Sequence, residues 1–140
     1  MAREKISFLK YFLWIIVIVA LFTAIDFAVH SMVDYLEIYY YPIPQSLMFV
    51  SESPLVWYAI GKFFGATIIG ALLFPIVKRI PKLWAKSLVF TLVIIVLLEV
   101  RYILSGYYGN LWHLYNFIQH GIALFAVSYI VFWKTKAVRA

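Results

Sequence analysis

Two pairs of residues with metal-ligating side chains stand one helical turn apart in otherwise apolar sequence. Asp26 and His30 are four residues apart, and so are Asn116 and His120. On a helix this spacing places both members of a pair on one face. Imidazole and carboxylate groups suit zinc, copper and iron. The pattern therefore predicts candidate ligands for a transition metal, which His113 could complete.

Two further charged residues, Lys62 and Glu99, lie inside apolar runs. A charged side chain in hydrocarbon costs at least ~2.5–3.5 kcal/mol, so such groups persist where they pair, meet water or bind something. The candidate metal ligands are Asp26, His30, Glu99, His113 and His120. The candidate residues for a small polar ligand are Asp26, His30, Lys62, Glu99 and Asn116.

Other interpretations of these groups stay open. Asp26 or Glu99 could simply pair with Lys62 or Arg101 inside a helix bundle. A b-type haem between His30 and a histidine of the last apolar run is a weaker alternative, because no motif marks it. No nucleophile or metalloprotease motif is present, so enzymatic activity is undecided and no catalytic residue is named.

The elements that must position these groups are four apolar runs. Of the 140 residues, 66% are hydrophobic and 13% charged, whereas a soluble domain carries about 25% charged residues. A bilayer core of ~30 Å needs about 20 helical residues. The runs cover residues 8–34, 55–77, 84–104 and 111–133, with an outer interfacial segment at residues 35–54. We predict one all-α domain, residues 1–140, forming an antiparallel four-transmembrane-helix bundle.

The basic residues predict the orientation of this bundle. Ten of the twelve lysines and arginines flank the start of the first run, the connection after the second, or the end of the fourth. The positive-inside rule then places both termini inside, as N-in and C-in, in a multi-pass protein of the cell membrane. These charges face lipid headgroups in this interpretation, which argues against a nucleic-acid partner.

The same orientation fixes the depth of the polar groups. With a rise of ~1.5 Å per residue, Asp26, Glu99 and His120 all fall in the outer half of their spans. Lys62 falls in the same half of the second span. We therefore expect Asp26 to point into the bundle, with its nearest charge partner supplied by Lys62 or a histidine of the fourth span.

Small residues and a proline mark the second span. Gly61 and Gly65 stand four apart, as do Ala66 and Gly70, a spacing that lets helices approach closely in lipid. The face of the second span that carries these small residues could pack against other helices of this bundle or against another subunit. Pro75 is expected to kink the inner end of the helix.

These observations favour a small integral membrane binding subunit. Its outer-half polar pocket would take a metal ion, namely zinc, copper or iron, or a small polar ligand. The alternative is a structural or assembly subunit of a larger membrane complex, indicated by the small size and the glycine seam. The expected partners are the lipid bilayer and either further copies of the chain or other membrane subunits.

Overall fold

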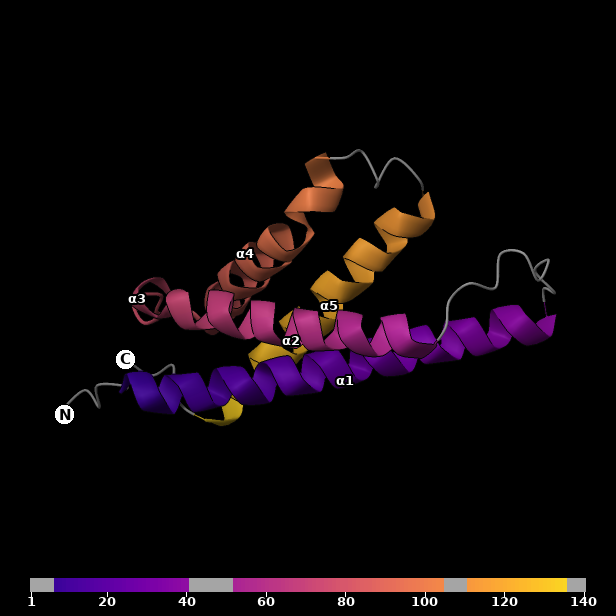
Figure 1. Ribbon diagram of the computed structural model, residues 1–140. Coiled ribbons are helices and arrows are strands. Elements are labelled where there is room, and N and C mark those ends of the chain that lie inside the picture. Colours follow the sequence, from indigo (N-terminus) through magenta and orange to yellow (C-terminus); the bar gives the residue numbers. More distant parts are fainter. Residues whose placement is uncertain (1–6, 41–51, 105–110, 136–140) are drawn as a thin grey trace.

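The computed structural model describes residues 7–40, 52–104 and 111–135. Within these ranges the side chains of residues 33–40, 52–58, 101–102, 111–113 and 115–116 are not described. The elements are α1 (Phe8–Tyr40), α2 (Glu52–Leu72), α3 (Phe74–Val77), α4 (Leu83–Leu104) and α5 (Leu111–Lys134), shown in Figure 1. The described chain is all helical, as predicted, which is how a backbone satisfies its own hydrogen bonds in lipid.

Three of these helices are long and apolar enough to cross a membrane, and a fourth apolar stretch is shorter. The three windows are Phe8–Met32, Leu83–Val100 and Phe117–Lys134, and the shorter stretch is Ala59–Leu72 within α2. Helices α4 and α5 begin and end within one residue of the predicted spans. Helix α1 continues past residue 34 to Tyr40, so the first half-dozen residues of the expected interfacial segment are helical. The rest of that segment, up to residue 51, lies outside the described residues.

The second predicted span is interrupted near its end. Helix α2 ends at Leu72, Leu73 forms a turn, and α3 follows. Pro75 lies in the first turn of α3, where its missing N–H leaves no intrahelical bond unmade. The expected kink is therefore a break, and the short α3 leads through Pro81 into α4.

The four long helices enclose a common interior. Helix α1 packs against α2 and α5, and α4 packs against the same two helices. In Figure 1, α4 and α5 incline away from the α1–α2 pair. The buried apolar side chains come from the four long helices, the turn at Leu73 and α3: Tyr11, Ile15, Ile18, Val19, Phe22, Ala66, Leu73, Val77, Phe90, Ile94, Ile95, Leu124, Val127, Val131 and Phe132. The rings of Phe90 and Phe132 meet edge to face, with centroids 5.6 Å apart.

The glycines of α2 serve different surfaces. A methyl group on Gly70 would lie 2.7 Å from Ile15 Cγ2, and one on Gly65 would lie 2.9 Å from Leu98 Cδ2. These two glycines therefore let α1 and α4 approach α2 closely. Tyr11 reinforces the first contact by donating a 2.8 Å hydrogen bond from its hydroxyl to the carbonyl of Gly70. Gly61 faces open space, so its predicted part in the internal seam is not observed.

Exposed basic side chains gather at one end of the described structure. Lys10 lies in the first turn of α1, and Lys78, Arg79 and Lys82 lie in the connection around α3. Figure 1 places the start of α1 and α3 at the same end. This grouping agrees with the sequence pattern behind the predicted orientation. The orientation itself, and the antiparallel bundle, stay predictions.

Candidate metal centre

Asp26 is the centre of a cluster of charged and imidazole side chains. It lies in α1, about 27 Å from Phe8 at a rise of ~1.5 Å per residue, and is only 5% exposed. Its Oδ2 atom is 2.9 Å from Lys62 Nζ of α2, and its Oδ1 atom is 2.7 Å from His120 Nε2 of α5. The expectation that Asp26 points inward is confirmed, and its partners come from both predicted sources.

His120 lies between two carboxylates. Its Nε2 faces Asp26, and its Nδ1 is 3.6 Å from Glu99 Oε1 of α4. All three residues are buried. Metal-bound histidines commonly direct their second ring nitrogen to a carboxylate, which orients the ring. The Glu99 carboxylate lies on the Nδ1 side of the His120 ring, opposite Asp26, at ion-pair distance and beyond hydrogen-bond range.

His30 approaches Asp26 from one turn further along α1. Its Nδ1 lies 2.9 Å from the backbone oxygen of Asp26 and 3.3 Å from Oδ1. A proton on Nδ1 would be donated to that backbone oxygen, and Nε2 would then carry the free lone pair. The side chain of His30 is 25% exposed, against 7% or less for Asp26, Lys62, Glu99 and His120. His30 is therefore the member through which the cluster meets its surroundings.

Lys62 brings a positive charge into the same space. Its Nζ lies 3.2 Å from His120 Nε2 as well as 2.9 Å from Asp26 Oδ2. The ammonium also stands 5.9 Å from the ring centroid of the fully buried Phe22, where the face of an aromatic ring attracts a cation. The ring of Phe22 meets that of His120 edge to face at 6.2 Å.

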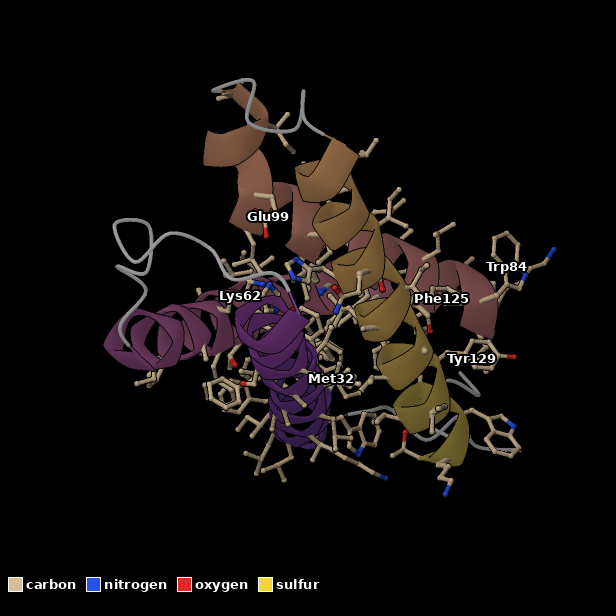
Figure 2. All side chains as sticks on the ribbon, turned by 90° about the vertical axis from the view of Figure 1, so that its right-hand side faces the viewer. Met32, Lys62, Trp84, Glu99, Phe125 and Tyr129 are labelled. Atoms are coloured by element: carbon tan, nitrogen blue, oxygen red, sulfur yellow. The ribbon has the colours of Figure 1, made fainter. Side chains whose placement is uncertain are left out.

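Each of four helices supplies part of the cluster. Asp26 and His30 come from α1, Lys62 from α2, Glu99 from α4 and His120 from α5. Figure 2 looks along α1 and shows Lys62 and Glu99 pointing into the space between the helices, whereas Trp84 points away from it. Each of these four helices packs against two of the others. Side chains at similar heights along their inner faces therefore come close together.

Three of these residues form a group that could hold a metal ion. One ligand atom each from Asp26, His30 and His120 lies within 4.8 Å of the other two. Two imidazoles and one carboxylate suit zinc, copper or iron, and this donor set leaves coordination positions open. Among the residues that the structure describes, these are the side chains best placed to bind a metal.

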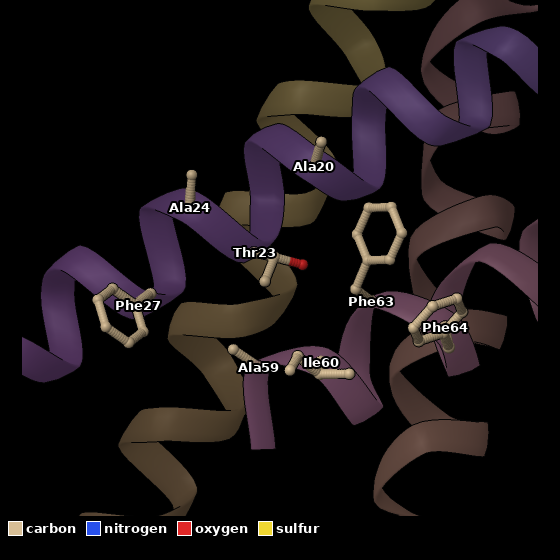
Figure 3. Close-up of a pocket in the computed structure, with 8 residues that line it drawn as sticks. All are labelled: Ala20, Thr23, Ala24, Phe27, Ala59, Ile60, Phe63 and Phe64. Atoms are coloured by element: carbon tan, nitrogen blue, oxygen red, sulfur yellow. The ribbon is translucent and has the colours of Figure 1, made fainter. Parts of the chain in front are cut away.

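An open groove on the side of the molecule is chemically different. It has a volume of about 410 Å³ and lies between α1 and α2 (Figure 3). Its walls are Ala20, Thr23, Ala24, Phe27, Ala59, Ile60, Phe63 and Phe64. The Thr23 hydroxyl is the one polar side-chain group among them and has no hydrogen-bond partner among the described residues. The groove therefore offers an apolar surface, not the polar pocket expected from the sequence.

The predicted site residues divide into two sets. Asp26, His30, Lys62, Glu99 and His120 come together as described. His113 and Asn116 belong to α5, but their side chains lie outside the described residues, and so does that of Arg101 in α4. Phe22 was not among the predicted residues. Its position four residues before Asp26, on the same helix face, was the signal that could have identified it.

No family model, curated protein or solved structure matches this chain. The chemistry of the Asp26 cluster therefore has to be judged from the residues of this chain alone.

Proposed function

We propose that this chain is a small integral membrane protein that binds one transition-metal ion, zinc, copper or iron, at Asp26, His30 and His120. The observation that carries the proposal is the convergence of these three side chains to within 4.8 Å inside the helix packing. Asp26 and His30 share one face of α1 because of their spacing, but His120 follows Asp26 by 94 residues and lies in α5. The approach of His120 to the other two is not a consequence of helical periodicity.

The surroundings of the three side chains support a bound cation. Asp26 and Glu99 bring two carboxylates to the cluster, beside the ammonium of Lys62 and two imidazoles. Charges interact strongly in surroundings from which water is excluded. In this proposal Glu99 supplies the outer carboxylate, which would orient the His120 ring once the metal is bound. A metal ion would satisfy the donor set of one carboxylate and two imidazoles.

A metal ion alone fits this arrangement better than haem does. The rings of His30 and His120 have centroids 5.7 Å apart, and the Asp26 carboxylate contacts both. Haem between them would require the rings to separate and Asp26 to withdraw. No comparable rearrangement is needed for a single ion, whose ligand bonds of roughly 2.0–2.2 Å draw the three side chains together.

The proposed membrane arrangement places this centre in the outer half of an N-in, C-in bundle. The exposed basic end of α1 and α3 would lie inside, and the partly exposed His30 would be the point of access from the outer side. Cysteine introduced at Leu83, at the start of α4, should resist a membrane-impermeant thiol reagent in intact cells. Labelling of that residue from outside would contradict the orientation without affecting the metal proposal.

Elemental analysis of the purified protein tests the metal proposal. We expect about one zinc, copper or iron per chain after purification in mild detergent, or after loading with the metal and removal of the excess. Cobalt loading should give the visible absorption of a site with nitrogen and oxygen ligands. Asp26→Asn and His120→Ala should lose the metal, whereas Gln119→Ala, the neighbour of His120 in α5, should retain it. Wild-type protein that stays empty when offered all three metals would refute the proposal.

A further inference from the structure

The cation nearest to the three ligands belongs to the protein itself. Lys62 Nζ lies 2.9 Å from Asp26 Oδ2 and 3.2 Å from His120 Nε2. These are hydrogen-bond distances to two of the three proposed ligand residues. A metal ion bonded to the same two residues would stand within a few ångströms of the ammonium.

Two cations at this separation repel each other strongly. At an effective dielectric constant near 20, the repulsion between two like charges 4 Å apart corresponds to roughly a thousandfold loss of affinity. Lys62 is 6% exposed, so little water is available to screen the repulsion. The Lys62 ammonium and a metal ion therefore cannot both occupy their best positions beside Asp26.

We infer that Lys62 is a built-in competitor that occupies the cation position beside Asp26 and that an incoming divalent metal must displace. This inference rests on the proposed function and adds its regulation. In the metal-free protein the ammonium compensates Asp26, which stabilises the four-helix packing. On metal binding the flexible lysine side chain turns away towards the ring of Phe22 or Glu99. The centre thus binds metal more weakly than its ligands alone would.

The surroundings of Lys62 offer the ammonium somewhere to go. The ring centroid of Phe22 is 5.9 Å from Nζ, within the range at which an aromatic face attracts a cation. Glu99 carries a carboxylate on the other side of His120. A short rotation of the lysine side chain could exchange Asp26 for either neighbour without exposing the charge to lipid.

Affinity measurements on two lysine variants test this inference. Lys62→Met keeps most of the length of the side chain and removes its charge, and we expect zinc to bind at least about a hundredfold more tightly than to the wild type. Lys86→Met is the matched control, because Lys86 is equally buried but lies in the first turn of α4. Its affinity should equal that of the wild type. Zinc is titrated into protein in mild detergent against a chelator of known affinity.

The metal-free Lys62→Met protein could be too unstable to isolate, because Asp26 loses its ammonium partner. Lys62→Arg, which keeps the charge, then serves as the second variant and should not bind zinc more tightly than the wild type. Thermal unfolding gives a further measurement, since zinc should raise the melting temperature of Lys62→Met more than that of the wild type.

The outcomes separate the inference from the proposed function. If the wild type binds zinc and Lys62→Met binds it equally well or more weakly, Lys62 is not a competitor, and the proposed metal centre is unaffected. If Lys62→Met binds zinc and the wild type does not, Lys62 acts as a competitor, but metal binding is not the activity of the natural chain. Failure of both proteins to bind any zinc overturns both ideas.

Discussion

The two halves of the helix assembly bury their polar side chains in opposite ways. In the half that holds Asp26, charged groups from four helices contact one another within 2.7–3.6 Å. In the half near the basic end, Lys86 is 1% exposed, yet no hydrogen bond or ion pair joins its ammonium to any residue within the described ranges. The buried core of this half includes the rings of Phe90 and Phe132, which meet edge to face.

This difference separates two uses of a buried charge. A cluster in which carboxylates, imidazoles and an ammonium meet depends on every member, because removing one leaves a partner uncompensated. The ammonium of Lys86 is buried without a carboxylate or imidazole partner among the described residues. The first arrangement brings a set of metal-binding groups together, whereas the second does not.

The largest effect should follow from replacing Asp26 by leucine. Lys62 and both histidines would lose their shared carboxylate, and the stability should fall by about 3–5 kcal/mol. Metal binding should disappear as well. Unfolding in a denaturing detergent and metal titration measure the two effects. Phe27→Leu, an exposed change on the adjacent position of α1, should alter neither, and a stable Asp26→Leu protein that still binds metal would remove the basis of the comparison.

Replacing Glu99 by glutamine should weaken metal binding while leaving the three ligands in place. Loss of the carboxylate behind His120 typically costs about 10–100-fold in metal affinity. The chelator competition assay described for zinc gives the value. If the affinity instead disappeared altogether, Glu99 would be a direct ligand, as the sequence first suggested, and not a residue that orients His120.

Gly70→Ala tests the packing of the other half. The added methyl group would meet Ile15 Cγ2 at 2.7 Å and the ring of Phe90 at 3.3 Å, and overpacking of this kind costs about 1–2 kcal/mol. Gly61→Ala is the matched control, because open space surrounds Gly61. Only Gly70→Ala should lower the stability, and neither variant should change metal affinity. A clear loss of stability in Gly61→Ala would point to a contact with a second subunit at that glycine.

The smallest effect is expected from Lys86→Met. Since the ammonium of Lys86 has no ion-pair partner among the described residues, its removal strands no buried partner and should not lower the free energy of unfolding. The same detergent unfolding assay measures this value. A cost comparable to that of Asp26→Leu would show that the half near the basic end also contains a buried charge pair, and the contrast between the two halves would fail.

Much of the fold could be predicted because its signal is local. The apolar runs gave the ends of α4 and α5 within one residue, since a membrane helix requires an uninterrupted stretch of suitable length. The end of α2 was predicted less well. Pro75 prevents continuous hydrogen bonding near this point, but whether a helix bends or breaks depends on how the following turn packs.

The candidate site could be predicted in part for a different reason. Charged residues in apolar runs are few, so the sequence alone named Asp26, Lys62, Glu99 and His120 as residues that need partners, and their depths predicted that they could meet. It could not give the order in which the helices surround the interior. That order decides that His120 lies between Asp26 and Glu99 and that Glu99 stands behind the ring.

The sequence by itself therefore determined the helical class, three of the four predicted spans, and the identities of the buried polar groups, because hydrophobicity, length and helical spacing are properties of neighbouring residues. The tertiary structure alone decided which groups touch. Gly65 and Gly70 bring α4 and α1 against α2, and this close approach sets Lys62 at 2.9 Å from Asp26. Contacts of that kind depend on how whole helices rotate and pack against one another. No local pattern in the sequence specifies this arrangement.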